Sequence, residues 1–424
     1  MIIEDAGIEK GNNMRILYFS QFYTPESIAP SFRAAENSKI WTNSGHEVTV
    51  FTGYPNYPTG KIFSGYTPKL ISREKIKGVN VVRSKLIAKP NTSTLRRLEN
   101  ALSYFFFGLI NILFNNGKIG KGYDVILGTS GVIFNALLAQ IYAKLHKVPF
   151  VFEIRDITYI QMQATGKDED DVAVKVMKKL ELFLCRKAKK VVVVTNGFKK
   201  VLVEDGIDEE KVEVITNGVD VNVSAGAYDE GKKFILGYFG TLGVSQNIVD
   251  TFDYGLNIGK LVKDFKYLII GEGAQRTEIV QLAKKSMFIE VLPGMPSEKL
   301  EPYYCDIQMS VITLRKTDKF KYTIPSKLFQ IMGRGIAVLF IGPDGEAADI
   351  IRENHSGIAL TGTKEEDLRI LKDFFMQPDW KKKMREMGIN GRKAVERQYS
   401  RTRLAKAYIK ILRNVSKEQC QIFD

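Results

Sequence analysis

Short apolar segments alternate with amphipathic segments along most of the chain. Several of the apolar segments, such as residues 125–128 (VILG) and 191–194 (VVVV), contain no polar side chain. Strands that are apolar on both faces are typical of parallel sheets covered by helices, whereas a period near 3.6 residues indicates the helices between them. The pattern therefore predicts repeated βαβ units and an α/β fold.

The predicted strands fall into two series separated by a segment without periodicity. The first series comprises residues 15–19, 47–51, 79–84, 125–128, 150–153, 191–194 and 212–215, and the second comprises 234–239, 267–270, 289–292, 308–312, 338–341 and 358–360. Two series predict two domains of about 200 residues each, which face each other across a cleft. We expect an N-terminal extension (1–13), a Rossmann-like domain (14–220), a linker (221–233), a second Rossmann-like domain (234–400) and a C-terminal helix and tail (401–424).

The segment after the last predicted strand is expected to be helical, over residues 365–397 and 401–415. No strand follows the second of these helices, so its apolar face needs another partner. That face carries Leu404, Tyr408, Ile411 and Leu412. We expect the C-terminal helix to return to the first domain.

The composition is that of a soluble globular protein, with 44% hydrophobic and 26% charged residues among 424. These proportions indicate neither disorder nor a polytopic membrane protein. The three cysteines are far apart and form neither a disulfide framework nor a zinc-ligand pair, which favours a reducing cytoplasm. Residues 1–13 lack the apolar core of a secretory signal. The net charge of +14 fits nucleic acid, an anionic membrane surface or phosphorylated small molecules as partners.

Two glycine-bearing segments follow predicted strands of the second series, at residues 240–243 (GTLG) and 271–273 (GEG). Glycine lets the backbone approach a ligand closely, and ligands gather at the carboxyl ends of parallel strands. Both segments are candidate phosphate-binding loops, although a tight turn without a ligand is an equally good interpretation of the first. Arg276 stands where a dinucleotide fingerprint has its third glycine, which disfavours a nicotinamide or flavin cofactor.

A cation stands at the start of a predicted helix in the second domain. Pro325 suits the first turn of a helix and so places Ser326 and Lys327 at its positive end. A positive charge is unfavourable there, which indicates an anionic ligand. Gln330 lies on the same helical face, where its amide can bind a hydroxyl of that ligand. The alternative is a surface lysine without a function.

Several phrases spread over residues 14–400 resemble glycosyltransferase family 4, which has the two-domain fold known as GT-B and transfers sugars with retention. In the first half these phrases are 20–26 (SQFYTPE), 45–50 (GHEVTV), 52–60 (TGYPNYPTG), 153–156 (EIRD) and 217–220 (NGVD). In the second half they are 240–243, 271–273, 325–329 (PSKLF) and 344–348 (DGEAA). The subgroup that is most similar is that of bacterial surface-polysaccharide transferases related to the fucosaminyl transferases.

The resemblance implies a nucleotide-sugar donor site in the second domain, with the 240–243 loop at the phosphates and the backbone near 292–295 at the base. It implies that Lys327 neutralises the diphosphate and stabilises it as a leaving group. The expected donor-binding residues are Gly240, Thr241, Leu242, Gly243, Gly271, Glu272, Gly273, Met295, Ser326, Lys327, Leu328 and Gln330. Retention in this family implies no obligatory protein nucleophile, so paired carboxylates are not expected.

The chain departs from the family pattern at four positions. The broader family has a glutamate, seven further residues and a second glutamate, whereas Tyr322 and Gln330 stand at the matching positions here. Thr241 and Gln246 replace the usual arginine and lysine of the phosphate loop. Gln330 still hydrogen-bonds hydroxyls, but as a neutral group it loses charge assistance. Donor affinity is therefore expected to depend more heavily on Lys327.

Arg155 and Asp156 directly follow a buried strand and are expected to face the cleft. An acid there can orient the acceptor hydroxyl, so Lys327, Asp156 and Arg155 form the predicted catalytic set. A structural Arg–Asp pair or a helix cap is an equally good interpretation of the latter two. The 54–60 loop has two aromatics that we expect to be exposed, suited to stacking on a sugar or to a rigid turn. The expected acceptor-binding residues are Glu26, Tyr54, Asn56 and Tyr57.

The chain has only three histidines and no ligand set for a divalent cation, so neither a metal nor another cofactor is expected. GT-B enzymes generally need none. The nucleotide sugar is then a substrate, and Lys327 carries the charge neutralisation.

Basic residues precede the most apolar stretch of the chain, residues 102–114. The basic residues are Lys69, Arg73, Lys75, Lys77, Arg83, Lys85, Lys89, Arg96 and Arg97, and the apolar ones are Phe105, Phe106, Leu109, Ile110 and Leu113. The stretch is shorter than the roughly 20 residues of a spanning helix, so the segment from Lys69 to Phe114 is expected to lie on the inner-membrane surface. The alternative is a buried crossover helix with a solvated basic loop. No nucleic-acid-binding signature accompanies the charge, so no nucleic acid is expected as a partner.

These features predict a retaining glycosyltransferase, cytoplasmic and peripheral on the membrane. It is expected to move a hexose or N-acetylamino sugar from a nucleotide donor, UDP-linked, to a lipid-linked or polysaccharide acceptor in the biosynthesis of a bacterial surface glycan such as O-antigen or capsule. Two alternatives are a nucleotide-sugar epimerase of the same fold and a catalytically silent nucleotide-sugar-binding partner. The interfacial segment disfavours the epimerase, and Tyr322 and Gln330 motivate the silent partner.

Overall fold

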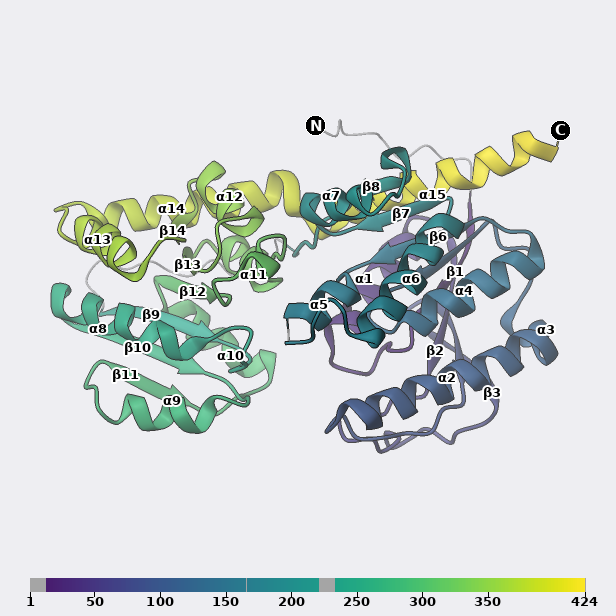
Figure 1. Ribbon diagram of the computed structural model, residues 1–424, viewed down its shortest axis with the longest axis horizontal. Coiled ribbons are helices and arrows are strands. Elements are labelled where there is room, and N and C mark those ends of the chain that lie inside the picture. The colour runs from purple at the N-terminus through teal and green to yellow at the C-terminus, as the bar shows by residue number, and fades with distance from the viewer. Residues whose placement is uncertain (1–12, 165, 221–232, 424) are drawn as a thin grey trace.

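Two largely parallel sheets, each with helices on both faces, form the protein (Figure 1). The structure is a computed structural model that describes residues 13–164, 166–220 and 233–423. The first sheet has the strand order β3-β4-β2-β1-β5-β6-β7-β8, and the second has the order β11-β10-β9-β12-β13-β14. All pairings are parallel except that of β3 with β4. The predicted fold class is confirmed.

The strands agree with the predicted series to within two residues at each end, apart from one that was not expected. The first sheet consists of β1 (Arg15–Phe19), β2 (Glu47–Gly53), β3 (Ile71–Ile76), β4 (Val79–Ser84), β5 (Val125–Thr129), β6 (Phe150–Ile154), β7 (Lys190–Val193) and β8 (Val212–Val214). The second consists of β9 (Phe234–Phe239), β10 (Phe265–Ile270), β11 (Ile289–Leu292), β12 (Met309–Thr313), β13 (Ala337–Ile341) and β14 (Gly357–Leu360).

Helices connect the strands and cover both faces of each sheet. Those of the first domain are α1 (Ala29–Asn43), α2 (Thr94–Phe114), α3 (Asn116–Ile119), α4 (Ile133–His146), α5 (Thr158–Ala164), α6 (Val172–Lys187) and α7 (Asn196–Glu204), with a 3-10 turn at Glu209–Lys211. Those that follow are α8 (Thr251–Leu261), α9 (Arg276–Ala283), α10 (Ser297–Asp306), α11 (Lys327–Gly333), α12 (Glu346–Glu353), α13 (Lys364–Phe375), α14 (Trp380–Ala394) and α15 (Arg401–Phe423), with 3-10 turns at Ile248–Asp250 and Asp318–Phe320 and a π-helical turn at Val395–Tyr399.

Alternating side chains of β1 show how one strand supports two cores. Leu17 and Phe19 pack with α2 and α4 on one face of the sheet, whereas Ile16 and Tyr18 pack with α1 and α15 on the other. A strand that is buried on both faces needs apolar residues at successive positions. This requirement explains why the predicted strands are continuous apolar runs.

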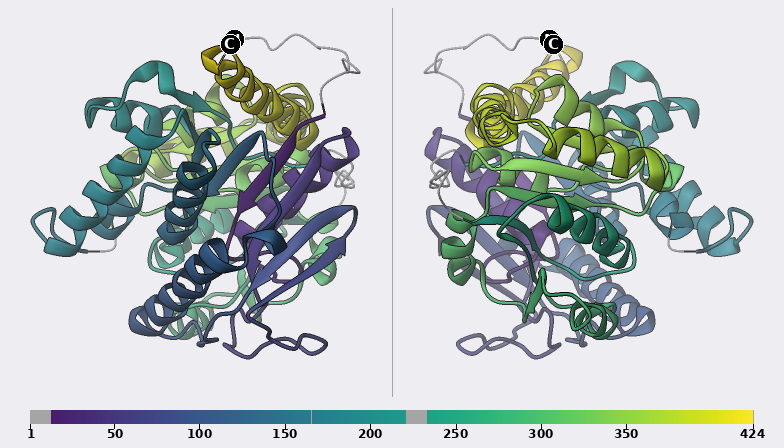
Figure 2. Two further views of the ribbon diagram at one scale, coloured as in Figure 1. Left: turned by 90° about the vertical axis from the view of Figure 1, so that its right-hand side faces the viewer. Right: turned by 90° about the vertical axis from the view of Figure 1, so that its left-hand side faces the viewer.

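The C-terminal helix α15 returns to the first domain, as predicted (Figures 1 and 2). The Trp41 indole on α1 donates to the carbonyl oxygen of Ala405 at 3.0 Å, and its ring lies 5.3 Å from that of Tyr408. Where the chain enters α15, Val219 forms an isolated parallel bridge with Ser400. The chain therefore leaves the first domain near Val219 and returns to it near Ser400, and these two segments lie side by side.

Three expectations about the elements need correction or fall outside the structure. The strand β3 was missed because its residues alternate with charged side chains at a sheet edge and form no apolar run. The helix expected over 365–397 is divided into α13 and α14, and Pro378, which favours a helix boundary, lies between them. The expected extension over 1–13 and linker over 221–233 lie outside the described residues, apart from Asn13 and Lys233.

Candidate functional site

Two glycine-bearing loops meet at the carboxyl ends of β9 and β10. The amide of Leu242 donates to the carbonyl oxygen of Glu272 at 2.8 Å, and the amide of Gly240 donates to that of Ile270 at 2.8 Å. A Cβ on Gly271 would lie 1.9 Å from the carbonyl oxygen of Gly240, so only glycine permits this contact. The two predicted phosphate loops therefore form one backbone surface.

Lys327 reaches this surface from the first residue of α11. Its Nζ donates to the carbonyl oxygen of Phe239 at 2.5 Å and lies 5.2 Å from the ring centre of Tyr238. A Cβ on Gly240 would lie 1.2 Å from the same Nζ. Burial lowers the pKa of the Lys327 ammonium to about 8. No carboxylate among the described residues forms an ion pair that would offset this effect. An ammonium held in this state is stabilised by an incoming anion.

The loop after β11 closes the predicted donor site at the base end. Glu272 accepts a hydrogen bond from the amide of Gly294 at 3.0 Å, and Glu272 also pairs with Arg276 at 3.3 Å. Met295 is partly buried and packs against a core of the second domain. The structure therefore brings the 240–243, 271–273 and 292–295 segments together with Lys327.

Not every predicted donor residue presents a free side chain. Leu242 and Leu328 are fully buried, and the amide of Leu328 donates to the carbonyl oxygen of Pro325. These two residues pack inside the loop and the helix start. Their side chains are therefore not accessible for the predicted contacts with the donor. Thr241, Ser326 and Gln330 are exposed and remain candidates for direct contact.

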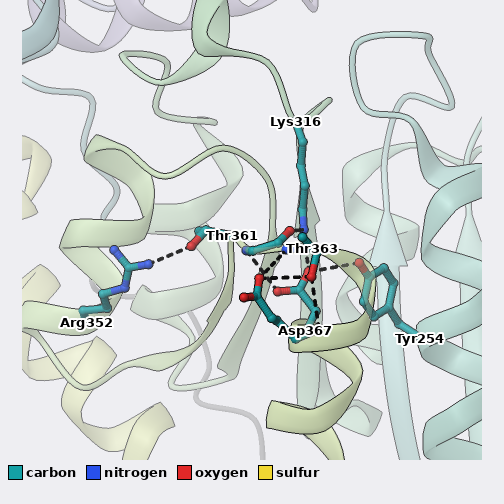
Figure 3. Close-up of polar contacts among 8 residues, drawn as sticks. Tyr254, Lys316, Arg352, Thr361, Thr363 and Asp367 are labelled. Carbon is teal, nitrogen blue, oxygen red and sulfur yellow. Dashed lines mark hydrogen bonds and ion pairs between the residues drawn. The ribbon is translucent and has the colours of Figure 1, made fainter.

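A polar network fixes the segment that leads into α11 (Figure 3). The amide of Arg315 donates to the carbonyl oxygen of Ser245 at 2.9 Å, and the neighbouring Lys316 pairs with the fully buried Asp367. Asp367 also accepts hydrogen bonds from the Tyr254 hydroxyl at 3.0 Å and from the Gly362 amide at 3.1 Å. This network ties the end of the phosphate loop to α8 and α13. No sequence pattern indicated this network, because its members are far apart along the chain.

The predicted acceptor residues form a buried scaffold rather than an exposed aromatic surface. Glu26 accepts hydrogen bonds from the amides of Asn56 at 2.9 Å and Tyr57 at 3.0 Å, and burial raises its pKa. Asn56 is 3% exposed and accepts a bond from Asn100. Tyr54 is 2% exposed and its hydroxyl bonds Ser72, so the expectation that it is exposed was wrong. Of the two aromatics only Tyr57 remains partly accessible.

Arg155 and Asp156 lie at the carboxyl end of β6, both partly exposed. The amide of Arg155 donates to the Ser130 hydroxyl at 2.9 Å. Burial raises the pKa of Asp156 to about 6, against the opposing effects of Arg155 and of a hydrogen bond from Gln161. No ion pair joins the two side chains in the described part of the chain, so the structural Arg–Asp pair is absent there.

A contact across the two domains involves a residue to which the sequence assigned no role. The Glu346 carboxylate at the start of α12 accepts hydrogen bonds from the amides of Asn196 at 2.7 Å and Gly197 at 2.9 Å. Both amides belong to the first turn of α7, where a negative charge is favourable. Tyr322 packs against Gly197, because a Cβ on that glycine would lie 2.1 Å from the tyrosine ring. Tyr322 therefore serves the domain contact.

The helix α2 exposes an apolar face that differs in part from the predicted one. Phe105 and Leu109 turn toward the core of the first domain. The exposed residues are Leu95, Leu98, Leu102, Phe106, Leu113 and Phe114, each at least 45% accessible. Arg83 is buried and pairs with Glu74, so it does not belong to the basic surface, whereas most of the other predicted cations are exposed.

Two absences concern the described residues only. Among them no three His, Cys, Asp or Glu side chains are placed to hold a metal ion. Likewise, none of the helices in the described ranges has the length and apolar character needed to cross a membrane.

Comparisons with known proteins support the resemblance to family 4 and the fold. Residues 34–223 match the sequence family described as Glycosyltransferase Family 4. The chain is 22% identical over 343 residues to WcaI of Escherichia coli (strain K12), whose name describes a glycosyl transferase of colanic acid biosynthesis, with 76% of this chain and 82% of that protein covered. The resemblance to family 4 transferases is thereby confirmed.

Solved structures with little sequence identity share the two-domain fold. Sucrose-phosphate synthase from Thermosynechococcus elongatus superposes with a TM-score of 0.71 at 14% identity, covering 95% of this chain and 99% of that chain. Anabaena Alr3699/HepE in complex with UDP and glucose superposes with a TM-score of 0.65 at 12% identity, covering 94% of this chain and 99% of that chain. The GT-B architecture therefore extends over both domains.

Proposed function

Because the chain is a glycosyltransferase of the GT-B fold with a family 4 domain, we propose that it transfers a hexose or N-acetylamino sugar with retention from a UDP-sugar. The acceptor in this proposal is lipid-linked or a polysaccharide, and the product enters a cell-surface glycan. The reaction takes place on the cytoplasmic face of the membrane.

The observation that carries the proposal is the position of Lys327 over the glycine loop. Its Nζ is partly buried, has a lowered pKa and lies against Gly240, where only a glycine leaves room for it. A diphosphate at this point gains the ammonium together with N–H groups of the loop other than those of Gly240 and Leu242, which donate to carbonyl oxygens. Support for UDP comes from HepE, a protein of the same fold that is described in complex with UDP and glucose.

In the proposed reaction Lys327 stabilises the charge that develops on the departing diphosphate. The bond between the anomeric carbon and the phosphate oxygen breaks while the acceptor oxygen bonds to the anomeric carbon from the same face of the sugar, which gives retention. The proton of the acceptor hydroxyl passes to the departing diphosphate. Preorganised charge at the leaving group is the main protein contribution to such a step. Asp156, whose pKa is raised to about 6, is ionised at neutral pH and orients the acceptor hydroxyl. With Lys327 in this role we propose a reaction that requires no metal ion.

The exposed face of α2 supports an acceptor at a membrane surface. Leu98, Leu102 and Phe106 follow each other at helical spacing on the outer side of the first domain, and exposed Arg96 and Arg97 flank them. A basic, apolar helix face of this kind inserts at the boundary between headgroups and acyl chains. The glycan assignment is supported by WcaI, whose name places it in colanic acid biosynthesis.

One observation favours a second candidate, a catalytically silent partner that binds nucleotide sugars. Tyr322 stands where the family has a glutamate, and its ring is engaged with Gly197 in the domain contact. The decisive experiment is a transfer assay with UDP-glucose and UDP-N-acetylglucosamine, using a bacterial lipid extract as acceptor. An α-linked product, or slow donor hydrolysis without acceptor, supports the enzyme. UDP binding with neither reaction supports the silent partner.

A further inference from the structure

The guanidinium of Arg155 has no partner in the described part of the chain. Its Nε is shielded from solvent and makes no hydrogen bond, and no carboxylate lies within ion-pair distance of the side chain. Burying part of a charged group without a partner is costly, and native proteins normally pair such a group or use it to bind a ligand. This unpaired cation at the carboxyl end of β6 therefore needs an explanation.

The carboxylate of Glu153, which attracts the Arg155 guanidinium, is already engaged by another arginine. Glu153, which is fully buried on β6, accepts from Arg33 Nε at 2.8 Å and from the Tyr18 hydroxyl at 2.8 Å. Arg33 also donates to the Asn217 side chain at 2.9 Å. Arg33, Glu153, Tyr18 and Asn217 thus satisfy one another and leave Arg155 outside the network.

None of the remaining charges around Arg155 forms an ion pair with it in the described part of the chain. Burial and the like charge of Arg33 lower the pKa of Arg155, against the opposing effects of Glu153 and Asp156. Glu36 on α1 pairs with Arg401, and its pKa is raised chiefly by burial. Asp156 makes no ion pair with Arg155. The protein therefore offers an arginine fork that neighbouring carboxylates attract but do not bind.

The same side chain remains partly exposed, so a ligand can reach it. It follows the carboxyl end of β6 in the first domain, whereas Lys327 and the glycine loops that suit the donor diphosphate belong to the second domain. A planar arginine fork binds carboxylate and phosphate groups with two parallel hydrogen bonds. A second anionic group on a substrate would thus be bound apart from the donor diphosphate.

We propose that Arg155 binds an anionic group of the substrate, a carboxylate or a phosphate, which is carried by the transferred sugar or by the acceptor. The proposal rests on the proposed transferase function and adds to it the charge of one substrate. If the transferred sugar carries the anion, the donor is a uronic acid derivative. If the acceptor carries it, the acceptor is linked to a diphosphate.

The first test measures whether Arg155 stabilises or destabilises the free protein. Arg155→Met keeps a flexible apolar stem and removes the unpaired charge, so the melting temperature is expected to stay level or rise by about 1–3 °C. Arg385→Gln, at an exposed site on α14, is the matched control. A clear fall in the melting temperature of Arg155→Met alone would show a structural arginine and overturn the proposal.

The second test locates the anion by calorimetric titration. If the sugar carries it, the wild type binds UDP-glucuronate about 10- to 100-fold more tightly than UDP-glucose, and Arg155→Met abolishes that difference while it still binds UDP. If the acceptor carries it, geranyl diphosphate binds to the UDP-saturated wild type and loses about the same factor in the variant. Either result supports the proposal and names the source.

Loss of neither interaction in Arg155→Met would overturn the proposal. Arg155→Lys, which keeps the charge but not the fork, is expected to recover binding only in part. The geranyl diphosphate titration is also run without UDP. If UDP fails to bind the wild type, the proposed function fails, while this arm still tests Arg155 on its own.

Discussion

Replacement of Lys327 by methionine is expected to lower donor affinity and turnover strongly while leaving the fold intact. The pKa of Lys327 falls from its usual 10.5 to about 8. Each pH unit corresponds to ~1.36 kcal/mol, so burial disfavours the ammonium by about 3 kcal/mol. A bound diphosphate can recover an energy of this order, which corresponds to a factor of about 100. Methionine keeps the aliphatic stem and loses only the charge.

The assay for this prediction combines UDP titration by calorimetry with turnover in the transfer reaction. Lys263→Met, at an exposed lysine in the second domain, serves as the matched control and is expected to behave as the wild type. Affinity of the wild type for UDP is expected to decline as the pH rises above about 8, because the free protein then loses the ammonium. Near-normal turnover of Lys327→Met, or UDP affinity unchanged up to pH 9, would refute the role assigned to Lys327.

Three other perturbations test separate parts of the molecule. Turnover is expected to fall below about pH 6 as Asp156 becomes protonated, and Asp156→Asn should remove this acidic limb of the pH–rate profile; a limb that persists in the variant would exclude Asp156. Leu98→Asp combined with Phe106→Asp is expected to reduce co-sedimentation with phosphatidylglycerol liposomes by about tenfold, whereas Met287→Asp in the second domain should have no effect; equal loss in both would count against α2. Glu346→Ala is expected to loosen the domain contact and increase the radius of gyration measured by small-angle scattering, and an unchanged radius would show that other contacts suffice.

The arrangement of the glycine loops and Lys327 was predictable because it is built from local signals. A glycine after a strand indicates close approach of the backbone, and a lysine at the helix start after Pro325 indicates an anionic ligand. Neither inference depends on distant residues. Parallel topology then places the carboxyl ends of successive strands at one edge, which brings Gly240, Gly271 and Lys327 together. The same reasoning predicted the return of α15, since an unpartnered apolar face must be covered.

The first domain was harder to predict because burial there is decided by distant partners. Tyr54 lies in a loop with turn residues and was expected to be exposed, but the Ser72 hydroxyl on β3 satisfies it in the interior. Arg83 belongs to a basic run, yet Glu74 on the neighbouring strand draws it into the sheet. Both partners lie on β3, the strand whose charged residues gave no apolar pattern. Because β3 was not predicted, Tyr54 and Arg83 were both expected to be exposed, whereas both are buried.

The contact of Glu346 with α7 could not be inferred from the chain, because it joins residues about 150 positions apart. The phrase that contains Glu346 was noticed only through its resemblance to the family. In the structure its carboxylate accepts from two amides of the opposite domain. Such a role depends on how the domains face each other, which no local pattern encodes.

The measurement that tests the central claim most directly is nucleotide binding at the Lys327 site. Purified protein is compared by thermal shift and calorimetry with UDP, GDP, ADP and UDP-sugars, each with magnesium and with a chelator. We predict that UDP and a UDP-sugar stabilise the protein, that the chelator has no effect, and that Lys327→Met abolishes most of the stabilisation. No shift with any nucleotide, or a shift that Lys327→Met leaves unchanged, would contradict the account.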